Sequence, residues 1–228
     1  MAFTLSELRN AVQRTAEPQA WATRAAALAD ERQRIEQFVD SGGQAYGFTT
    51  LFGHLDAIKR EREAILNLYQ GHLVGHPKLL DPKIARGVVV VKLCQLSNGG
   101  TGISLSSYER LRAGYASGLD DVRVDLRASY GSGDVVPGAW LVNSIFGEAS
   151  DLHRGDLMAL INGAYVPAGV LLGSLNQLET VASRALSLTA EAREVSKKLQ
   201  KSVDVQLPVS LRDLAPLHEA VNHAREQL

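Results

Sequence analysis

Two pairs of histidines are spaced closely enough to suggest shared metal ligands. His72 and His76 stand four residues apart, a spacing that can place both on one face of a helix. Pro77 follows at once and no third ligand accompanies the pair, so this spacing does not predict a metal site. His218 and His223 flank a glutamate, as in zinc proteases, but histidines five apart diverge by about 140° on a helix. We therefore predict no metal site.

Two glycine-containing segments could serve phosphate binding or nucleophilic catalysis. Residues 98–102 read Asn-Gly-Gly-Thr-Gly, but they follow no clear strand and lack the Lys-Ser/Thr ending of a phosphate loop. Ser132 stands between two glycines, yet Tyr130 occupies the position where a hydrolase nucleophile elbow requires its first glycine. Neither segment predicts phosphate transfer or serine hydrolysis.

The apolar periodicity around these segments is mostly helical and predicts an all-α protein. Thr4 and Glu7 form the capping-box pattern that begins a helix. A second helix is predicted over 18–39, where apolar residues recur at three- and four-residue spacing before two glycines. Other predicted helices cover 57–73, about 166–203 and 211–228, with helical structure also from 138 onward. Two segments without a clear period are predicted to be ordered loops, 44–56 and 117–137.

Residues 84–97 fit two kinds of secondary structure. The four consecutive valines at 88–91 favour a buried strand by local propensity. Ile84, Val88, Val91 and Cys94 also satisfy helical spacing. The helical pattern on both sides, together with the resemblance described below, favours a helix.

The composition is that of an ordinary globular protein. The 228 residues are 45% hydrophobic and 21% charged, and we predict a single domain over residues 1–228. A formal net charge of −1 without a basic stripe argues against a nucleic-acid partner. Cys94 is the only cysteine, which excludes an internal disulfide. No signal-peptide pattern and no membrane-length apolar run is found, so we predict a cytoplasmic protein with no membrane partner.

Four segments, taken in order, carry a resemblance that no single motif would. Residues 46–53 read Tyr-Gly-Phe-Thr-Thr-Leu-Phe-Gly, and residues 69–76 read Tyr-Gln-Gly-His-Leu-Val-Gly-His. Residues 129–137 read Ser-Tyr-Gly-Ser-Gly-Asp-Val-Val-Pro, and residues 156–163 read Asp-Leu-Met-Ala-Leu-Ile-Asn-Gly. They resemble the YGxNTGFG, LQxNLxxSH, VGASGDLAP and EGLALLNG segments of the aromatic amino acid lyases, the family of histidine and phenylalanine ammonia-lyases.

The resemblance is strongest over residues 35–228 and implies the all-α fold of the N-terminal region of the ammonia-lyases (fumarase/aspartase-like). That fold has long central helices and is usually assembled as a tetramer whose sites draw on several subunits. This sequence departs from the family pattern in places. Thr49 replaces the family's Asn, Leu51 replaces its Gly, and the second segment is one residue shorter.

The resemblance also implies a cofactor made from the chain itself. In the family, an Ala-Ser-Gly tripeptide cyclises and loses two water molecules to give a methylidene-imidazolone (MIO), and Gly131-Ser132-Gly133 match that tripeptide. Ser132 would lose its hydroxyl to leave the electrophilic methylene. Gly133 would supply the attacking amide nitrogen, where the missing Cβ permits a tight turn, and Asp134 would help position and transfer protons. Gly131 replaces the usual alanine and adds backbone freedom of order 1 kcal/mol. Cyclisation is therefore expected to be slower or less complete, and a plain Gly-Ser-Gly turn is the alternative.

Three further residues match functional positions of the family. Tyr46 matches the tyrosine that acts as a base, which at neutral pH requires a positive field or an electrophile nearby; it could instead be a hydrogen-bonded core aromatic. His76 matches a substrate-contacting histidine, although the shortened segment leaves His72 as a competing candidate. Asn162 matches the asparagine beside the electrophile, where an amide can bind a substrate carboxylate; otherwise it caps a helix boundary before Gly163.

The resemblance predicts elimination of ammonia from an aromatic or imidazole amino acid. The alternatives are a 2,3-aminomutase with the same electrophile and a catalytically inactive homologue that acts as a binding subunit. The family's second helical half, which supplies a substrate-binding arginine, has no counterpart in this sequence. We therefore expect a truncated or split subunit that binds a small amino acid. It would form a homo-oligomer, or a hetero-oligomer with a C-terminal-half polypeptide.

Overall fold

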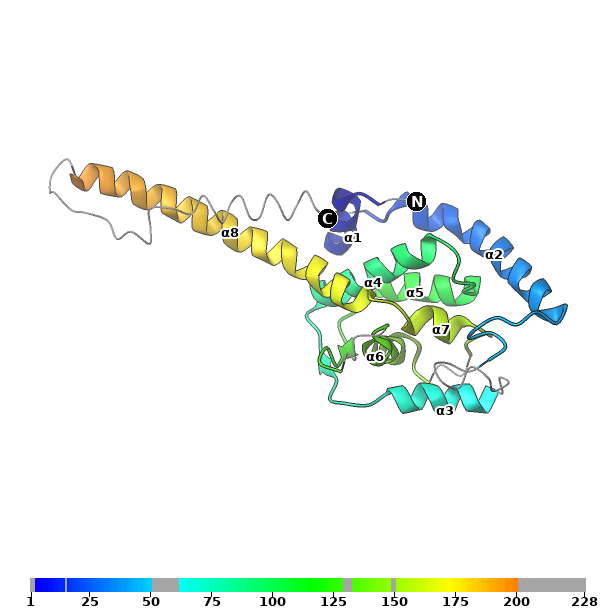
Figure 1. The fold of residues 1–228 in the computed structure, drawn as a ribbon. Helices are drawn as coiled ribbons and strands as arrows, with labels where there is room; N and C mark the ends of the chain where they lie inside the picture. The colour runs from blue at the N-terminus through cyan, green and yellow to red at the C-terminus, as the bar shows by residue number, and fades with distance from the viewer. Residues whose placement is uncertain (1–2, 15, 51–61, 129–132, 149–150, 201–228) are drawn as a thin grey trace. The chain divides into compact units, whose positions relative to one another are not determined.

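The computed structural model describes residues 3–14, 16–50, 62–128, 133–148 and 151–200 (Figure 1). Its helices are α1 (Leu5–Gln13), α2 (Gln19–Asp40), α3 (Arg62–His72), α4 (Pro82–Ser97), α5 (Leu105–Ser117), α6 (Val135–Phe146), α7 (Asp156–Ile161) and α8 (Tyr165–Gln200). Two short strands, β1 (Lys78–Leu79) and β2 (Arg123–Val124), pair antiparallel. The helical fold class predicted from the sequence is confirmed.

By internal contacts the chain divides into two compact units, residues 1–173 and residues 174–228. The first unit contains α1 to α7 and the first turns of α8. The predicted single domain over residues 1–228 stays a prediction. No helix in the described ranges combines the length and apolar character that crossing a membrane requires.

The first two helices begin where the sequence predicts. The Thr4 hydroxyl accepts from the Glu7 amide at 3.2 Å, and the Glu7 carboxylate accepts from the Thr4 amide at 2.8 Å. This reciprocal capping box satisfies amides that have no partner within the helix. Pro18 stands at the N-cap of α2, and Ser41 stands at its C-cap. Both boundaries lie within a residue of the prediction.

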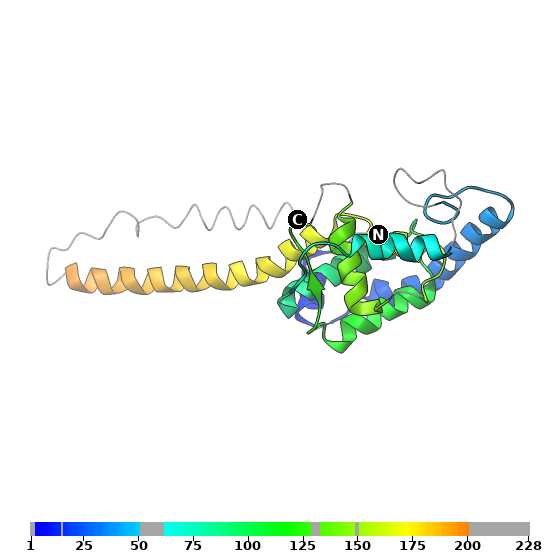
Figure 2. The same cartoon turned by 90° about the horizontal axis from the view of Figure 1, so that it is seen from below.

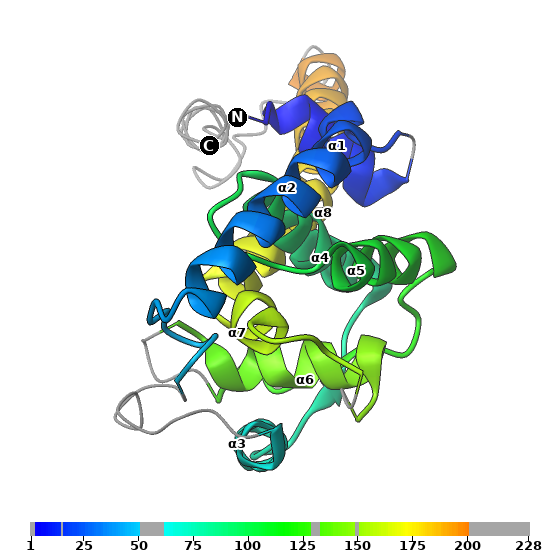
Figure 3. The ribbon, with the colours of Figure 1, turned by 90° about the vertical axis from the view of Figure 1, so that its right-hand side faces the viewer.

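The valine-rich segment is a helix, as predicted. Asp81 caps α4 by accepting from the Lys83 amide at 2.8 Å. Val88, Val89 and Val90 are all completely buried, because α4 packs against α1, α2 and α5 (Figure 3). A helix buried around most of its circumference carries apolar residues on several faces, so it loses the simple amphipathic pattern. Tertiary burial here overrides the strand propensity of valine.

Near its start, α4 also meets the first turns of α8 backbone to backbone. A Cβ atom added at Gly87 would collide with the Gly169 carbonyl oxygen, and one at Gly169 would collide with the Val88 Cα. A Cβ at Gly173 would lie 2.8 Å from the Ile84 Cα. The two helices can approach this closely only because these positions have no side chain.

The predicted loop over 117–137 is partly wrong. It contains β2, whose register places Val124 opposite Lys78, and the adjoining Leu80 amide donates to the Val122 carbonyl at 2.9 Å. Strands of two residues are too short to leave a periodic signal in the sequence. The helix α6 also begins before 138, because Pro137 is tolerated in a first turn.

The other predicted helices vary in how much of them the structure describes. α8 begins and ends within three residues of the predicted range, 166–203. α3 agrees with the second part of the predicted range 57–73, whose first residues lie outside the described ranges. The helix predicted over 211–228 also lies outside them.

The helix α6 lies in the middle of the lower layer of the first unit. It packs against α7 on one side and α3 on the other, as Figure 3 shows, and it also contacts β2. In the view from below, α3 lies in front of the rest of this layer (Figure 2). The short helix α7 is thereby placed between α6 and the upper helices.

Candidate active site

A cleft of about 550 Å³ opens beside the C-terminal end of α7. Its walls come from α2, the loop that follows α2, the end of α4 and the end of α7. The polar side chains that line it are Arg34, Tyr46, Gln95, Thr101 and Asn162. The larger apolar side chains that line it are Ile35, Phe38, Phe48 and Met158. The fold thus brings Tyr46 and Asn162, predicted as site residues from separate segments, into one cleft.

Asn162 ends α7 and lies against the last residue of the Gly131-Ser132-Gly133 tripeptide. The Gly163 amide donates to the Gly133 carbonyl at 2.9 Å. A Cβ atom at Gly133 would lie only 2.5 Å from the Asn162 Oδ1, and Gly133 has a φ of +72°. Both the left-handed backbone and the neighbouring amide therefore require glycine at this position. Asn162 is also at a helix boundary, the C-cap of α7.

The structure describes only one residue of the tripeptide, Gly133, and the Asp134 that follows it. Gly131 and Ser132 lie outside the described residues. Asp134 follows as the N-cap residue of α6, with a left-handed φ of 45° and a side chain that is 8% exposed. A carboxylate at this end of a helix is favoured by the helix dipole.

Tyr46 lies in the loop after α2 and is 48% exposed. The turn that carries it is closed by Thr49, whose hydroxyl accepts from the Ala45 amide at 3.0 Å. The Thr49 amide also donates to the Ala45 carbonyl at 2.9 Å. The threonine that replaces the family's asparagine therefore has a local role in shaping this loop. Leu51, the other departure in this segment, lies outside the described residues.

His76 does not line the cleft but lies beside the segment that leads into the tripeptide. Its backbone amide donates to the Asp125 Oδ2 at 2.7 Å, and the Trp140 Nε1 donates to the Val74 carbonyl at 2.8 Å. Amide donors from His76 and Arg127 lower the pKa of Asp125. The competing candidate, His72, has its Nδ1 2.6 Å from the Leu68 carbonyl oxygen of its own helix.

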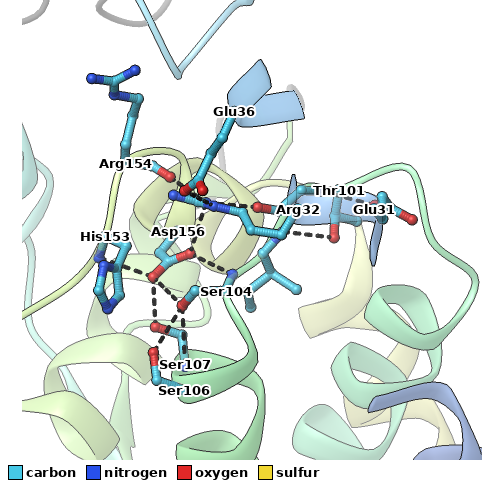
Figure 4. A network of polar contacts seen from close by, with 12 residues as sticks. Glu31, Arg32, Glu36, Thr101, Ser104, Ser106, Ser107, His153, Arg154 and Asp156 are labelled. Atoms are coloured by element: carbon cyan, nitrogen blue, oxygen red, sulfur yellow. Dashed lines mark hydrogen bonds and ion pairs between the residues drawn. The ribbon is translucent and has the colours of Figure 1, made fainter. Parts of the chain in front are cut away.

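The N-terminal end of α7 is fixed by a buried carboxylate that sequence inspection missed. Asp156 is completely buried and accepts from the Ser104 hydroxyl and the Ser107 hydroxyl, both at 2.7 Å. It also accepts from the Ser104 and His153 amides at 2.8 and 2.9 Å (Figure 4). The Arg32 Nη1 lies 3.6 Å from the Asp156 Oδ1, the oxygen that accepts from the Ser104 amide. Four hydrogen bonds and an ion pair leave this carboxylate no capacity for substrate, so its role is structural.

Arg32 connects this network to the cleft. Its Nη1 donates to the Gly102 and Arg154 carbonyls at 2.8 and 2.5 Å, and its Nε pairs with Glu36 at 2.6 Å (Figure 4). Its guanidinium carbon lies 5.2 Å from the centre of the Phe48 ring, which lines the cleft. The network therefore ties α2 and α5 to α7 and supports one wall of the cleft.

A buried lysine lies at the opposite end of α7. The Lys92 Nζ donates to the Gln95 Oε1 at 3.0 Å and to the Asn162 carbonyl at 2.9 Å. It lies 4.2 Å from the centre of the Tyr165 ring. Burial lowers the pKa of Lys92 to about 7. Its one sequence signal is a single charge inside the apolar run 88–94.

Comparison with known proteins identifies the family. The family model for aromatic amino acid lyases matches residues 3–158. The histidine ammonia-lyase of Alkaliphilus metalliredigens is 26% identical over 195 residues, which are 73% of this chain and 38% of that protein. The histidine ammonia-lyase of Geobacillus thermodenitrificans is 29% identical over 161 residues, which are 68% of this chain and 32% of that protein. The chain thus spans less than two-fifths of the length of these relatives.

Solved structures support the fold. The phenylalanine aminomutase of Pantoea agglomerans matches 99% of this chain and 60% of its own, with a TM-score of 0.68 and 14% identity. A tyrosine aminomutase mutant matches 82% of this chain and 40% of its own, with a TM-score of 0.65 and 20% identity. At identities of 14 and 20%, the structural likeness establishes the fold alone. The family is shown by the family model, whose match over residues 3–158 covers most of the chain. The protein belongs to the aromatic amino acid lyase family.

Proposed function

We propose that this chain carries the electrophile-forming part of an ammonia-lyase site and eliminates ammonia from an aromatic or imidazole amino acid. The observation that supports this most directly is the contact of Asn162 and Gly163 with Gly133. The proposal is supported because the asparagine expected beside the electrophile lies against the last residue of the tripeptide expected to form it. The relatives named histidine ammonia-lyase support the same class of reaction.

The described residues fit an MIO formed from Gly131, Ser132 and Gly133. The left-handed Gly133 and its carbonyl, held by the Gly163 amide, suit a backbone folded tightly at this point. The Asn162 side chain fills the space that a larger residue at 133 would need. When formed, the group supplies an electrophilic methylene.

The side chains of the cleft suit an amino acid with a ring. Ile35, Phe38, Phe48 and Met158 offer apolar surface for the ring, and Arg34 adds a positive charge for an anionic ligand.

In the proposed reaction Tyr46 accepts the proton from the β-carbon, the bond between the α-carbon and nitrogen breaks, and ammonia leaves as the double bond forms. Asn162 binds the carboxylate. His76 does not line the cleft, and its proposed contact with substrate rests on its match to the family's histidine.

We also propose that the chain works as an oligomer, either of identical copies or with a polypeptide that supplies the family's C-terminal half. Support comes from α8 after residue 173. Leu178, Val181, Leu188 and Val195 are 57, 64, 65 and 55% exposed there. With Ala185 and Ala192 they alternate at three- and four-residue spacing, which is the pattern of a coiled-coil seam. Light scattering of the purified chain should report a mass above one copy, alone or after co-expression with such a polypeptide.

The proposed cofactor is tested by intact-protein mass. We expect the chain to weigh less than its sequence by two water molecules, and the Ser132→Ala variant to have the mass of its own sequence. A wild-type mass equal to that of 228 unmodified residues would refute the cofactor.

The proposed reaction is tested by incubation with histidine, phenylalanine and tyrosine, with and without the partner polypeptide. Release of ammonium with an α,β-unsaturated acid supports the lyase. A β-amino acid product would instead identify an aminomutase. A chain that has lost two waters and turns over none of these substrates in either preparation would contradict the proposed reaction.

A further inference from the structure

Lys92 is a completely buried cation whose contacts are all uncharged. Its amine meets one amide oxygen, one backbone carbonyl and one aromatic ring. Within the described part of the chain no carboxylate forms an ion pair with it. Removing a charged amine from water without a counter-ion is costly, and an apolar residue of similar length would avoid that cost. The contacts that the amine makes must therefore account for its presence.

Those contacts converge on the peptide between Asn162 and Gly163. Directly, Lys92 holds the Asn162 carbonyl at 2.9 Å. Indirectly, it holds the Gln95 side chain at 3.0 Å, and the Gln95 amide packs so closely on Gly163 that a Cβ there would lie 2.6 Å from its Nε2. Asn162 and Gly163 contact Gly133 in turn, through the Asn162 side chain and the Gly163 amide. Lys92 thus stands one contact away from the tripeptide.

The Lys92 amine donates two hydrogen bonds, one to Gln95 and one to Asn162. An uncharged lysine amine has two N–H bonds, which match the two oxygen acceptors at 3.0 and 2.9 Å. Loss of the proton to solvent therefore leaves both hydrogen bonds in place. Because burial lowers the pKa of Lys92 to about 7, this uncharged form is well populated near neutral pH.

We propose that Lys92 is a positioning residue for the tripeptide: it fixes the 162–163 peptide so that the Asn162 side chain and the Gly163 amide meet Gly133. The contacts of Lys92 with Asn162 and Gln95 support this position directly. The consequence for ring formation rests on the proposed function. In that consequence, Lys92 sets how much of the chain cyclises without touching the reacting atoms.

The test compares Lys92→Met with Lys83→Met in the full chain. Lys83 is an exposed lysine of the same helix, so it controls for the loss of a charge from α4. Backbone hydrogen exchange is read at two amides, Gly163, which donates to Gly133, and Leu80, which donates to Val122. We expect Lys92→Met to speed Gly163 exchange by about tenfold or more with Leu80 unchanged, since opening would be local. Lys83→Met should change neither amide.

Two further variants keep the inference open to refutation. Lys92→Arg retains N–H donors and should keep Gly163 exchange within about threefold of wild type, a rescue that filling the space alone would not give. If Lys92→Met unfolds, so that Leu80 also loses protection, Gln95→Ala removes only the indirect contact and should still speed Gly163 exchange about threefold. Unchanged Gly163 exchange in a folded Lys92→Met, or in Gln95→Ala where Lys92→Met unfolds, would overturn the proposal.

The intact mass separates this inference from the proposed function. If the wild type has lost two waters, Lys92→Met should show a several-fold smaller dehydrated fraction, and Lys83→Met the wild-type fraction. An equal dehydrated fraction in both variants would refute the link between Lys92 and ring formation. If the wild type has lost no water, the proposed cofactor fails while the amide measurements still decide the role of Lys92.

Discussion

The two ends of α7 are both held by buried charged side chains, but in different ways. At the N-terminal end, the Asp156 carboxylate has a cationic partner and four hydrogen-bond donors. At the C-terminal end, the Lys92 amine has two neutral acceptors and an aromatic ring. Without a counter-ion, the amine can lose a proton and keep both hydrogen bonds, although the attraction of its charge to the Tyr165 ring is then lost. Burial lowers the pKa of Lys92 to about 7, and its two hydrogen-bond partners, Gln95 and Asn162, line the cleft.

The largest expected effect comes from breaking the N-terminal end. Asp156→Ala removes the buried carboxylate that pairs with Arg32, and it leaves the Ser104 and Ser107 hydroxyls without their acceptor. Removing one member of a buried pair costs about 3–5 kcal/mol of unfolding free energy, which urea denaturation would measure. Asp151→Ala, which removes a largely exposed partner of Arg110, should cost less than about 1 kcal/mol. Equal losses in the two variants would show that the network does not hold α7.

A smaller effect, dependent on pH, is expected at the C-terminal end. The pKa of Lys92 is about 7 in the folded chain and near its ordinary value of 10.5 when unfolded. Between these values the unfolded chain binds more protons, so the stability of wild type relative to Lys92→Met should rise with pH. The rise is at most about 1.4 kcal/mol per pH unit, and it should be absent below pH of about 6, where both states are protonated. Urea unfolding at pH 5.5 to 8.5 measures it.

Taking the difference between the two proteins cancels other titrating groups. Burial also raises the pKa of the Cys94 thiol from its ordinary value of 9.0 to about 12. The folded chain therefore binds more protons than the unfolded chain above pH of about 9, and its stability falls as the pH rises there. That contribution is common to wild type and Lys92→Met. A stability difference that stays flat from pH 5.5 to 8.5 would show that Lys92 keeps its ordinary pKa.

The smallest effect is expected beneath the lysine. The Tyr165 hydroxyl is buried with no hydrogen-bond partner in the described part of the chain. Tyr165→Phe should therefore leave the unfolding free energy within about 1 kcal/mol of wild type, or raise it, since an unsatisfied buried hydroxyl is costly. Tyr108→Phe is the matched control, because that hydroxyl contacts Ser97 at 2.9 Å and Trp21 at 3.2 Å. It should lose about 1 kcal/mol; a larger loss in Tyr165→Phe would contradict the comparison.

The sequence predicted the boundaries of the helices better than it predicted the residues of the cleft. Capping residues such as Thr4 and Asp81 act within one turn, so the boundaries they set are readable from local pattern. Tyr46 and Asn162 were found by resemblance, and their meeting in one cleft is a property of the fold. Arg34 and Gln95 had no signal, because one polar residue on a helix is ordinary until its neighbours from distant segments are known.

The buried charges are the clearest case of what local pattern misses. Asp156 stands in sequence like many surface residues, and the single charge of Lys92 in an apolar run does not say what it contacts. Their partners lie 49 or more residues away, apart from Gln95 and His153. Burial of a charge depends on contacts that only the folded chain creates. The two-residue strands were missed for a related reason. Two residues are too few to show the alternation of apolar and polar side chains that marks a strand.

The backbone contact of Gly87 with Gly169 bears on where this part of the chain can bend. Two helices whose main chains already touch cannot approach further, and sliding would bring bulkier neighbouring residues into a contact that has room only for glycine. The start of α8 is therefore anchored on α4, just as Asn162 is anchored by Lys92. The only non-helical positions between α7 and α8 are 162–164, and the Lys92 hydrogen bond holds the first of them. A motion that opened the cleft from this side would therefore have to break the Lys92 hydrogen bond first.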